Sequence, residues 1–63
     1  MIPHALLKYF EFAHLPATLQ EVSKPFHELA WALAQKLPQG EELDMALRKL
    51  LEAKDCAVRA ALD

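Results

Sequence analysis

The stretch Leu43–Leu62, LDMALRKLLEAKDCAVRAAL, constrains the fold of this chain most strongly. It contains no Gly and no Pro, and it is rich in Ala and Leu, which favour helices. Its apolar residues recur at intervals of three and four, so they share one face of a helix predicted over residues 41–62. The predicted buried stripe consists of Leu43, Leu47, Leu50, Leu51, Ala57, Val58 and Ala61.

A second helix is predicted over residues 16–37. Pro16 suits a first helical position, and Thr18 and Glu21 have capping-box spacing, so the helix begins at either point. Pro25 removes the hydrogen bond to the carbonyl of Glu21, so we expect the helix to be kinked or divided there. The predicted apolar face of this helix consists of Leu19, Val22, Phe26, Leu29, Ala30, Leu33 and Leu37.

The short connection between the two predicted helices contains Pro38 and Gly40, which both end helices. Such a connection implies an antiparallel helical hairpin. Residues 1–15, MIPHALLKYFEFAHL, are expected to form an N-terminal arm that packs its aromatic side chains onto the helices. The predicted fold is therefore all-α: a single domain over residues 1–63, built as a hairpin with an aromatic arm.

The length of the chain, 63 residues, makes a core of its own marginal. A domain of this size buries only about 60% of the surface that its unfolded chain exposes. Small domains usually need disulfides, a metal or oligomerisation, and the single cysteine, Cys56, excludes an internal disulfide. The hydrophobic content of 54% is high for so small a protein and also favours oligomerisation.

Seven Lys and Arg against nine Asp and Glu give a net charge of −2. This balance argues against a DNA- or RNA-binding protein, which shows a basic surface. No apolar run reaches the roughly 18 residues of a transmembrane helix, and the first residues do not form a signal peptide. A free cysteine without an export signal fits the reducing cytoplasm.

Lys54 is the one residue out of place in the predicted buried stripe. A lysine is rarely buried without a partner. One interpretation is that its methylene stem packs in the hairpin while the ammonium reaches water. A second is an ion pair with Glu11, Glu21 or Glu28, and a third is a contact between the ammonium and the phosphate of a ligand in a groove.

Aromatic residues and histidines offer further candidates. Tyr9, Phe10 and Phe12 either pack on the hairpin or provide a surface on which a base stacks. His14 either bonds the backbone near the helix start or belongs to the same binding surface. Trp31 lies off the apolar stripe, where it either covers the partner helix or contacts another subunit.

A charged row follows the opposite flank of the last helix, at spacings of four, three and four residues. It consists of Arg48, Glu52, Asp55 and Arg59. Its oppositely charged neighbours predict ion pairs along the helix. The row is either a solvated face or a self-complementary face for a second copy.

Catalytic and metal-binding patterns are weak. Cys56 lies among alanines with no base nearby in the sequence, so a packing thiol is the simpler interpretation. His4, His14 and His27 are not spaced i, i+4, so a helical metal pair is absent. We expect no enzyme activity, no metal and no cofactor.

Two segments resemble small phage proteins of the anti-CBASS and anti-Thoeris helical-hairpin family. They are Tyr9–Pro16, YFEFAHLP, and Leu47–Asp55, LRKLLEAKD, and the resemblance extends from Tyr9 to the C-terminus. It implies a non-enzymatic sponge that sequesters a cyclic di- or trinucleotide or an ADP-ribose-type signal, and so silences bacterial immunity in the cytoplasm of the infected host cell. It also implies a symmetric homo-oligomer, often a hexamer, with ligand pockets between subunits.

Carried onto this sequence, the resemblance implies that Tyr9 and Phe12 form the aromatic part of the ligand site. It places His14 at the polar position before the proline, and Lys54 and Arg59 where basic contacts occur. From their chemistry, Lys24 and Arg48 are added to the expected ligand-binding residues. The alternative function is a small homo-oligomeric interaction protein that binds a host protein through Trp31 and the charged row.

Overall fold

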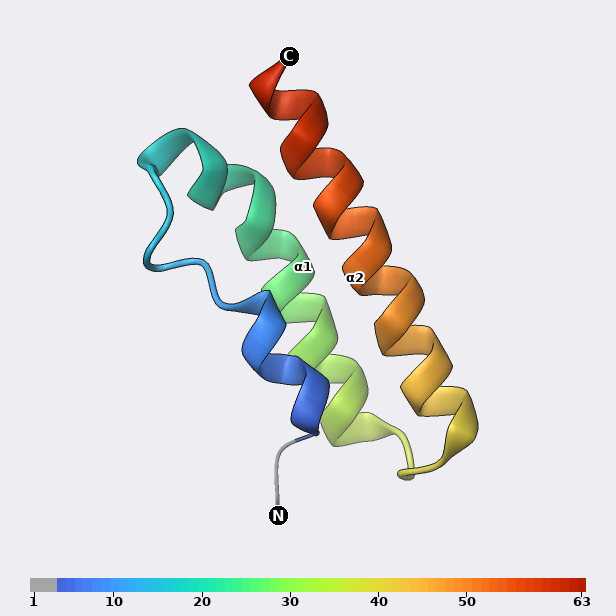
Figure 1. Ribbon diagram of the computed structural model, residues 1–63. Helices are drawn as coiled ribbons and strands as arrows, with labels where there is room; N and C mark the ends of the chain where they lie inside the picture. Colours follow the sequence, from blue (N-terminus) through green and yellow to red (C-terminus); the bar gives the residue numbers. More distant parts are fainter. Residues whose placement is uncertain (1–3) are drawn as a thin grey trace.

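The computed structural model describes residues 4–63, so residues 1–3 of the predicted arm lie outside the described part. It contains a short 3-10 helix η1 (Ala5–Phe10) and two long helices, α1 (Ala17–Lys36) and α2 (Glu41–Leu62). The described residues form no strand. Figure 1 shows α1 and α2 side by side and antiparallel, with η1 packed against them. The prediction of an all-α hairpin is confirmed.

Helix α2 matches its predicted bounds and most of its predicted buried stripe. Leu43 and Leu47 are buried, and four further members of the stripe are half-buried. Ala61 is exposed, and this part of the prediction is wrong. The last turn of α2 extends beyond the first turn of α1 in Figure 1, and residues 59–63 are all exposed.

Helix α1 runs unbroken through Pro25, so the predicted division into two helices does not occur. Its first turns lie at an angle to the rest in Figure 1, as the loss of one backbone hydrogen bond allows. The helix begins beside Pro16, whose carbonyl accepts from the N–H groups of Leu19 and Gln20, both at 2.9 Å. The described residues provide no side-chain cap there, so the alternative start with Thr18 as the cap is wrong.

The buried face of α1 differs from the predicted one. Its buried residues are small, namely Ser23, Ala30 and Ala34. Leu29 and Leu37, which were predicted to lie inside, are 48% and 44% exposed. Because both η1 and α2 pack over one side of α1, small side chains there let the three backbones approach closely.

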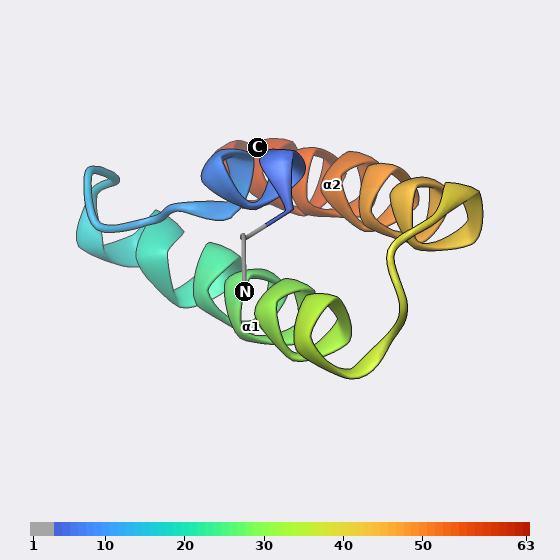
Figure 2. The ribbon, with the colours of Figure 1, turned by 90° about the horizontal axis from the view of Figure 1, so that it is seen from below.

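Helix η1 supplies the bulk of the side chains that fill this space. Phe10 is completely buried and Leu7 nearly so, and they pack with Ala30, Leu43 and Leu47 in one core. Seen from below, η1 lies close to α2 and above α1 (Figure 2). The arm therefore forms a third layer of the core, and its part from Ala5 to Phe10 is helical.

None of the helices in the described part of the chain is both long enough and apolar enough to span a membrane.

Candidate functional site

Lys54 binds the C-terminal end of η1. Its ammonium Nζ donates to the carbonyl oxygen of Tyr9 at 2.8 Å. It also lies 3.5 Å from the Asp55 carboxylate and 6.0 Å from the centre of the Phe10 ring. The last carbonyls of a helix lack partners within the helix, and a cation is favourable beside them. Lys54 therefore fixes the arm to α2.

This contact decides among the structural interpretations of Lys54. The side chain is 14% exposed, so its stem is packed, and its ammonium lines a groove while it is bonded to the protein. Within residues 4–63 no ion pair joins it to Glu11, Glu21 or Glu28, and that interpretation is wrong. The partner is a backbone carbonyl of the arm.

His27 holds the neighbouring carbonyl from α1. Its Nδ1 lies 3.1 Å from the carbonyl oxygen of Phe10, so the tautomer with a proton on Nδ1 donates to it. The same imidazole meets the Phe12 ring edge-on, with centroids 5.1 Å apart. Two successive carbonyls of η1 are thus held by side chains from the two long helices, which fixes the position of the arm.

A groove of about 380 Å³ opens where η1 and the 13–16 turn face the C-terminal half of α2. We name it the arm groove. Its described lining residues are Lys8, Tyr9, Glu11, His14, Leu15, Ser23, Lys54, Asp55, Val58 and Arg59. Four of the seven predicted ligand-binding residues meet here: Tyr9, His14, Lys54 and Arg59.

The arm groove carries mixed charge with a small positive excess. Its described cations are Lys8, Lys54 and Arg59, against the carboxylates of Glu11 and Asp55. Arg59 is exposed, and one guanidinium nitrogen contacts the Cys56 sulfur at 3.3 Å. Its remaining N–H groups can bind a phosphate or carboxylate.

Tyr9 presents an aromatic surface at the rim of the groove. It is 50% exposed, and the Lys8 ammonium lies 5.1 Å from its ring centre. An exposed ring beside cations is suited to stacking a planar group whose phosphate is bound by the cations. The groove can therefore hold a small anion that carries an aromatic ring.

Three predicted site residues do not line the arm groove. Phe12 is half-buried and packs on His27, which is a structural contact. Lys24 is exposed on α1. Arg48 lies near the other end of the hairpin, in a second pocket.

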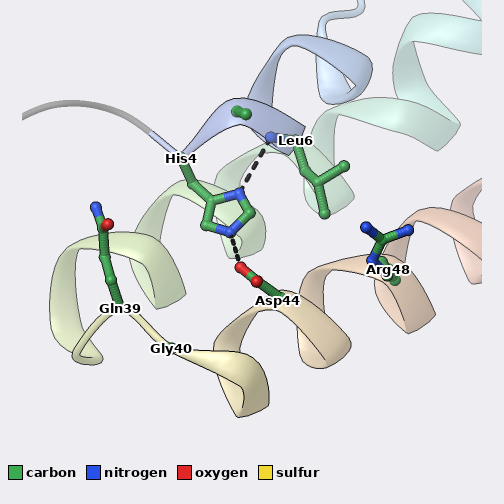
Figure 3. A pocket seen from close by; sticks show the side chains of 7 residues that line it. His4, Leu6, Gln39, Gly40, Asp44 and Arg48 are labelled. Carbon is green, nitrogen blue, oxygen red and sulfur yellow. Dashed lines mark hydrogen bonds and ion pairs between the residues drawn. The ribbon is translucent and has the colours of Figure 1, made fainter.

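The second pocket, of about 710 Å³, surrounds the connection between α1 and α2. Figure 3 shows His4 between two partners: its Nδ1 accepts from the Leu6 N–H at 3.1 Å, and its Nε2 contacts the Asp44 carboxylate. Arg48 lies one turn beyond Asp44 on α2 (Figure 3). The His4 contacts cap the N-terminus of η1 and join it to α2, so His4 and Asp44 serve the fold.

Trp31 of α1 lies beside a core cluster that includes Leu7 and Phe10 of the arm. It packs against the core cluster, and its ring lies 6.1 Å from that of His27. Its Nε1 is buried and has no hydrogen-bond partner within residues 4–63. The side chain is half-buried, and a contact between Trp31 and another subunit stays a prediction.

The charged row Arg48–Glu52–Asp55–Arg59 is exposed along its whole length. In the described part of the chain, no ion pair joins its members. Asp55 instead contacts Lys54, and Arg59 contacts Cys56. The predicted ion pairs along the helix are therefore not formed.

Gln20, which was not predicted, holds the turn that closes one end of the arm groove. Its amide Nε2 donates to the carbonyl of Leu15 at 2.7 Å and to that of Ala13 at 3.3 Å. His14 itself is exposed, and the described residues offer it no hydrogen bond, so the predicted bond from His14 to the backbone is wrong. A glutamine four residues after Pro16 was the available signal, because one helical turn brings its side chain back over the preceding turn.

Comparison with known proteins found no match for this chain among protein-family models, curated proteins or solved structures.

Proposed function

We propose that this protein binds and sequesters a cyclic nucleotide second messenger in the arm groove without cleaving it. The observation that carries this proposal is the meeting of Tyr9, His14, Lys54 and Arg59 in one groove. These residues come from the arm, the turn and α2, and all four were among the ligand-binding residues expected from the sequence. Their chemistry, an exposed ring beside cations, suits a nucleotide better than a purely apolar or purely anionic ligand.

The phosphate would be bound by Arg59 and Lys54. Arg59 is exposed and its free N–H groups form charge-assisted hydrogen bonds. The Lys54 ammonium has three N–H donors and uses one of them for the Tyr9 carbonyl, so it can bind an anion without releasing the arm. The base would stack on the exposed Tyr9 ring.

Copies of the chain are proposed to associate as a symmetric homo-oligomer. Large apolar side chains on the outer faces of both helices support this: Leu29, Leu37 and Met45 are between 44% and 50% exposed. In such an assembly Lys24 and Arg48, which lie outside the arm groove, would reach a ligand only from a neighbouring copy. The proposed setting is the cytoplasm of a phage-infected bacterial cell.

A thermal-shift panel tests the proposal. The ligands are cyclic di-AMP, cyclic di-GMP, cyclic tri-AMP and cyclic ADP-ribose, each at increasing concentration. A ligand that binds the folded protein raises the unfolding temperature progressively. Recovery of the intact nucleotide after denaturing the complex would distinguish sequestration from hydrolysis. No shift with any ligand would contradict the proposal.

The second candidate is a small homo-oligomeric interaction protein that binds a host protein. The exposed charged row favours this candidate, because no ion pair among the described residues joins its members to one another and they can therefore pair with a partner. A charge reversal at Glu52, the centre of the row, would abolish such binding. The same change would leave nucleotide binding intact, because Glu52 does not line the arm groove.

A further inference from the structure

Ser23 is the one buried polar side chain of the described core, and it lines the arm groove. It is 0% exposed, and its Oγ has no hydrogen-bond partner within residues 4–63. A helical serine commonly bonds the carbonyl four residues earlier, but Ser23 makes no such bond here. A buried hydroxyl without a partner destabilises the fold, so its presence beside a groove needs an explanation.

Packing alone does not require a hydroxyl at this position. The other buried residues of α1 are Ala30 and Ala34, which meet the need for small side chains. Alanine at position 23 would fill nearly the same space without a polar atom. The Oγ of Ser23 is therefore better explained by a hydrogen bond to a ligand than by packing.

The charged groups of the arm groove and its buried serine come from different elements. Charged side chains, including Lys54 and Arg59, come from the arm and from α2. Ser23 is the contribution of α1, and it is uncharged, able both to donate and to accept a hydrogen bond. A ligand that used both parts would carry an anionic group and, next to it, a neutral hydroxyl or amide-like edge.

We propose that Ser23 determines the specificity of the arm groove by hydrogen-bonding an uncharged polar group of the ligand, such as a sugar hydroxyl or a base edge. This inference rests on the proposed function and narrows it: the ligand is a nucleotide recognised beyond its phosphate. Because Ser23 is shielded from solvent in the free protein, a side chain at the rim moves when the ligand enters. The long side chain of Arg59 lines the same groove and is exposed, so it has the rotational freedom to do so.

The test compares Ser23→Ala with the wild-type protein by calorimetric titration of the nucleotide that shifts the wild-type unfolding temperature most. The control is Thr18→Ala, which deletes an exposed hydroxyl of α1 outside the groove. We expect Ser23→Ala to weaken binding about tenfold, which is the value of one good hydrogen bond to a ligand. The control should bind as the wild type does.

The unfolding temperature of the free variants provides the second readout. Ser23→Ala should unfold at the same or a higher temperature than the wild type, because it removes a hydroxyl that has no partner. Unchanged affinity in Ser23→Ala, or a lower unfolding temperature of the free variant, would overturn the proposed role of Ser23. The proposed function would not be affected by either result. Failure of the wild type to bind any nucleotide would overturn the proposed function and this inference together.

Discussion

The ammonium of Lys54 and the carbonyl oxygen of Tyr9 lie 2.8 Å apart, although 45 positions separate the two residues in the chain. This hydrogen bond joins the arm to α2 at the edge of the arm groove. Lys54 therefore positions the Tyr9 ring, and in the proposed function it also offers its charge to the ligand.

Replacement of Lys54 should affect both stability and binding. Lys54→Met retains an apolar stem but leaves the Tyr9 carbonyl without its donor, so we expect a loss of about 1–2 kcal/mol in the free energy of unfolding. Nucleotide affinity should fall as well. Urea unfolding and titration calorimetry measure the two effects, with the exposed Lys49→Met as the matched control. A Lys54 variant as stable as this control would show that the hydrogen bond does not hold the arm.

Arg59→Gln separates binding from stability. Arg59 is exposed and contacts only the Cys56 sulfur among the described residues, so its loss should change the free energy of unfolding by less than about 0.5 kcal/mol. Removal of its charge should weaken nucleotide binding and reduce the dependence of affinity on salt. Titrations at two salt concentrations test this, with Lys36→Gln as a control outside the groove. Equal salt dependence in Arg59→Gln and the wild type would mean that Arg59 does not bind the anion.

Two neighbouring aromatic residues should respond in opposite ways. Phe10 is completely buried, so Phe10→Leu should cost about 1–2 kcal/mol of unfolding free energy through lost packing. Tyr9 is half exposed, so Tyr9→Leu should change stability little but weaken nucleotide binding by removing the stacking surface. Denaturant unfolding and calorimetry on both variants would decide this. If Phe10→Leu loses nucleotide binding but keeps its full stability, the stacking surface is Phe10 and not Tyr9.

Gln20→Ala should loosen the turn that closes the arm groove. Both hydrogen bonds from its amide end on carbonyls of that turn, and their loss should cost about 1 kcal/mol. Faster amide hydrogen exchange should appear at residues 13–16 and not at the connection between α1 and α2. Gln35→Ala, which alters an exposed glutamine of the same helix, is the control. Equal exchange in the two variants would show that Gln20 does not order the turn.

The sequence predicted the hairpin because α2 carries a long helical period without Gly or Pro. The predicted buried face of α1 was partly wrong, because Leu29 and Leu37 fit the apolar periodicity of this helix as well as Ala30 does. The volume of Phe10 decides which part of that arc faces inward, and periodicity in α1 alone does not contain that information.

The candidate site was predictable in part. Lys54 stood out as a charge within an apolar stripe, but its partner is a backbone carbonyl, which any residue could have supplied. Tyr9, His14 and Arg59 were suggested by the resemblance and by their chemistry. Ser23 and Lys8 were missed, because a serine on a helix and a lysine in an arm give no signal until the fold brings them to one groove.

Nucleotide binding in the arm groove is tested most directly by a two-dimensional amide NMR titration of the wild-type protein with the nucleotide that stabilises it most. Binding there predicts that the largest chemical-shift changes occur at Tyr9, His14, Ser23, Lys54 and Arg59. Changes centred on His4, Asp44 and Arg48, around the connection between the long helices, would contradict it, as would a spectrum that does not change.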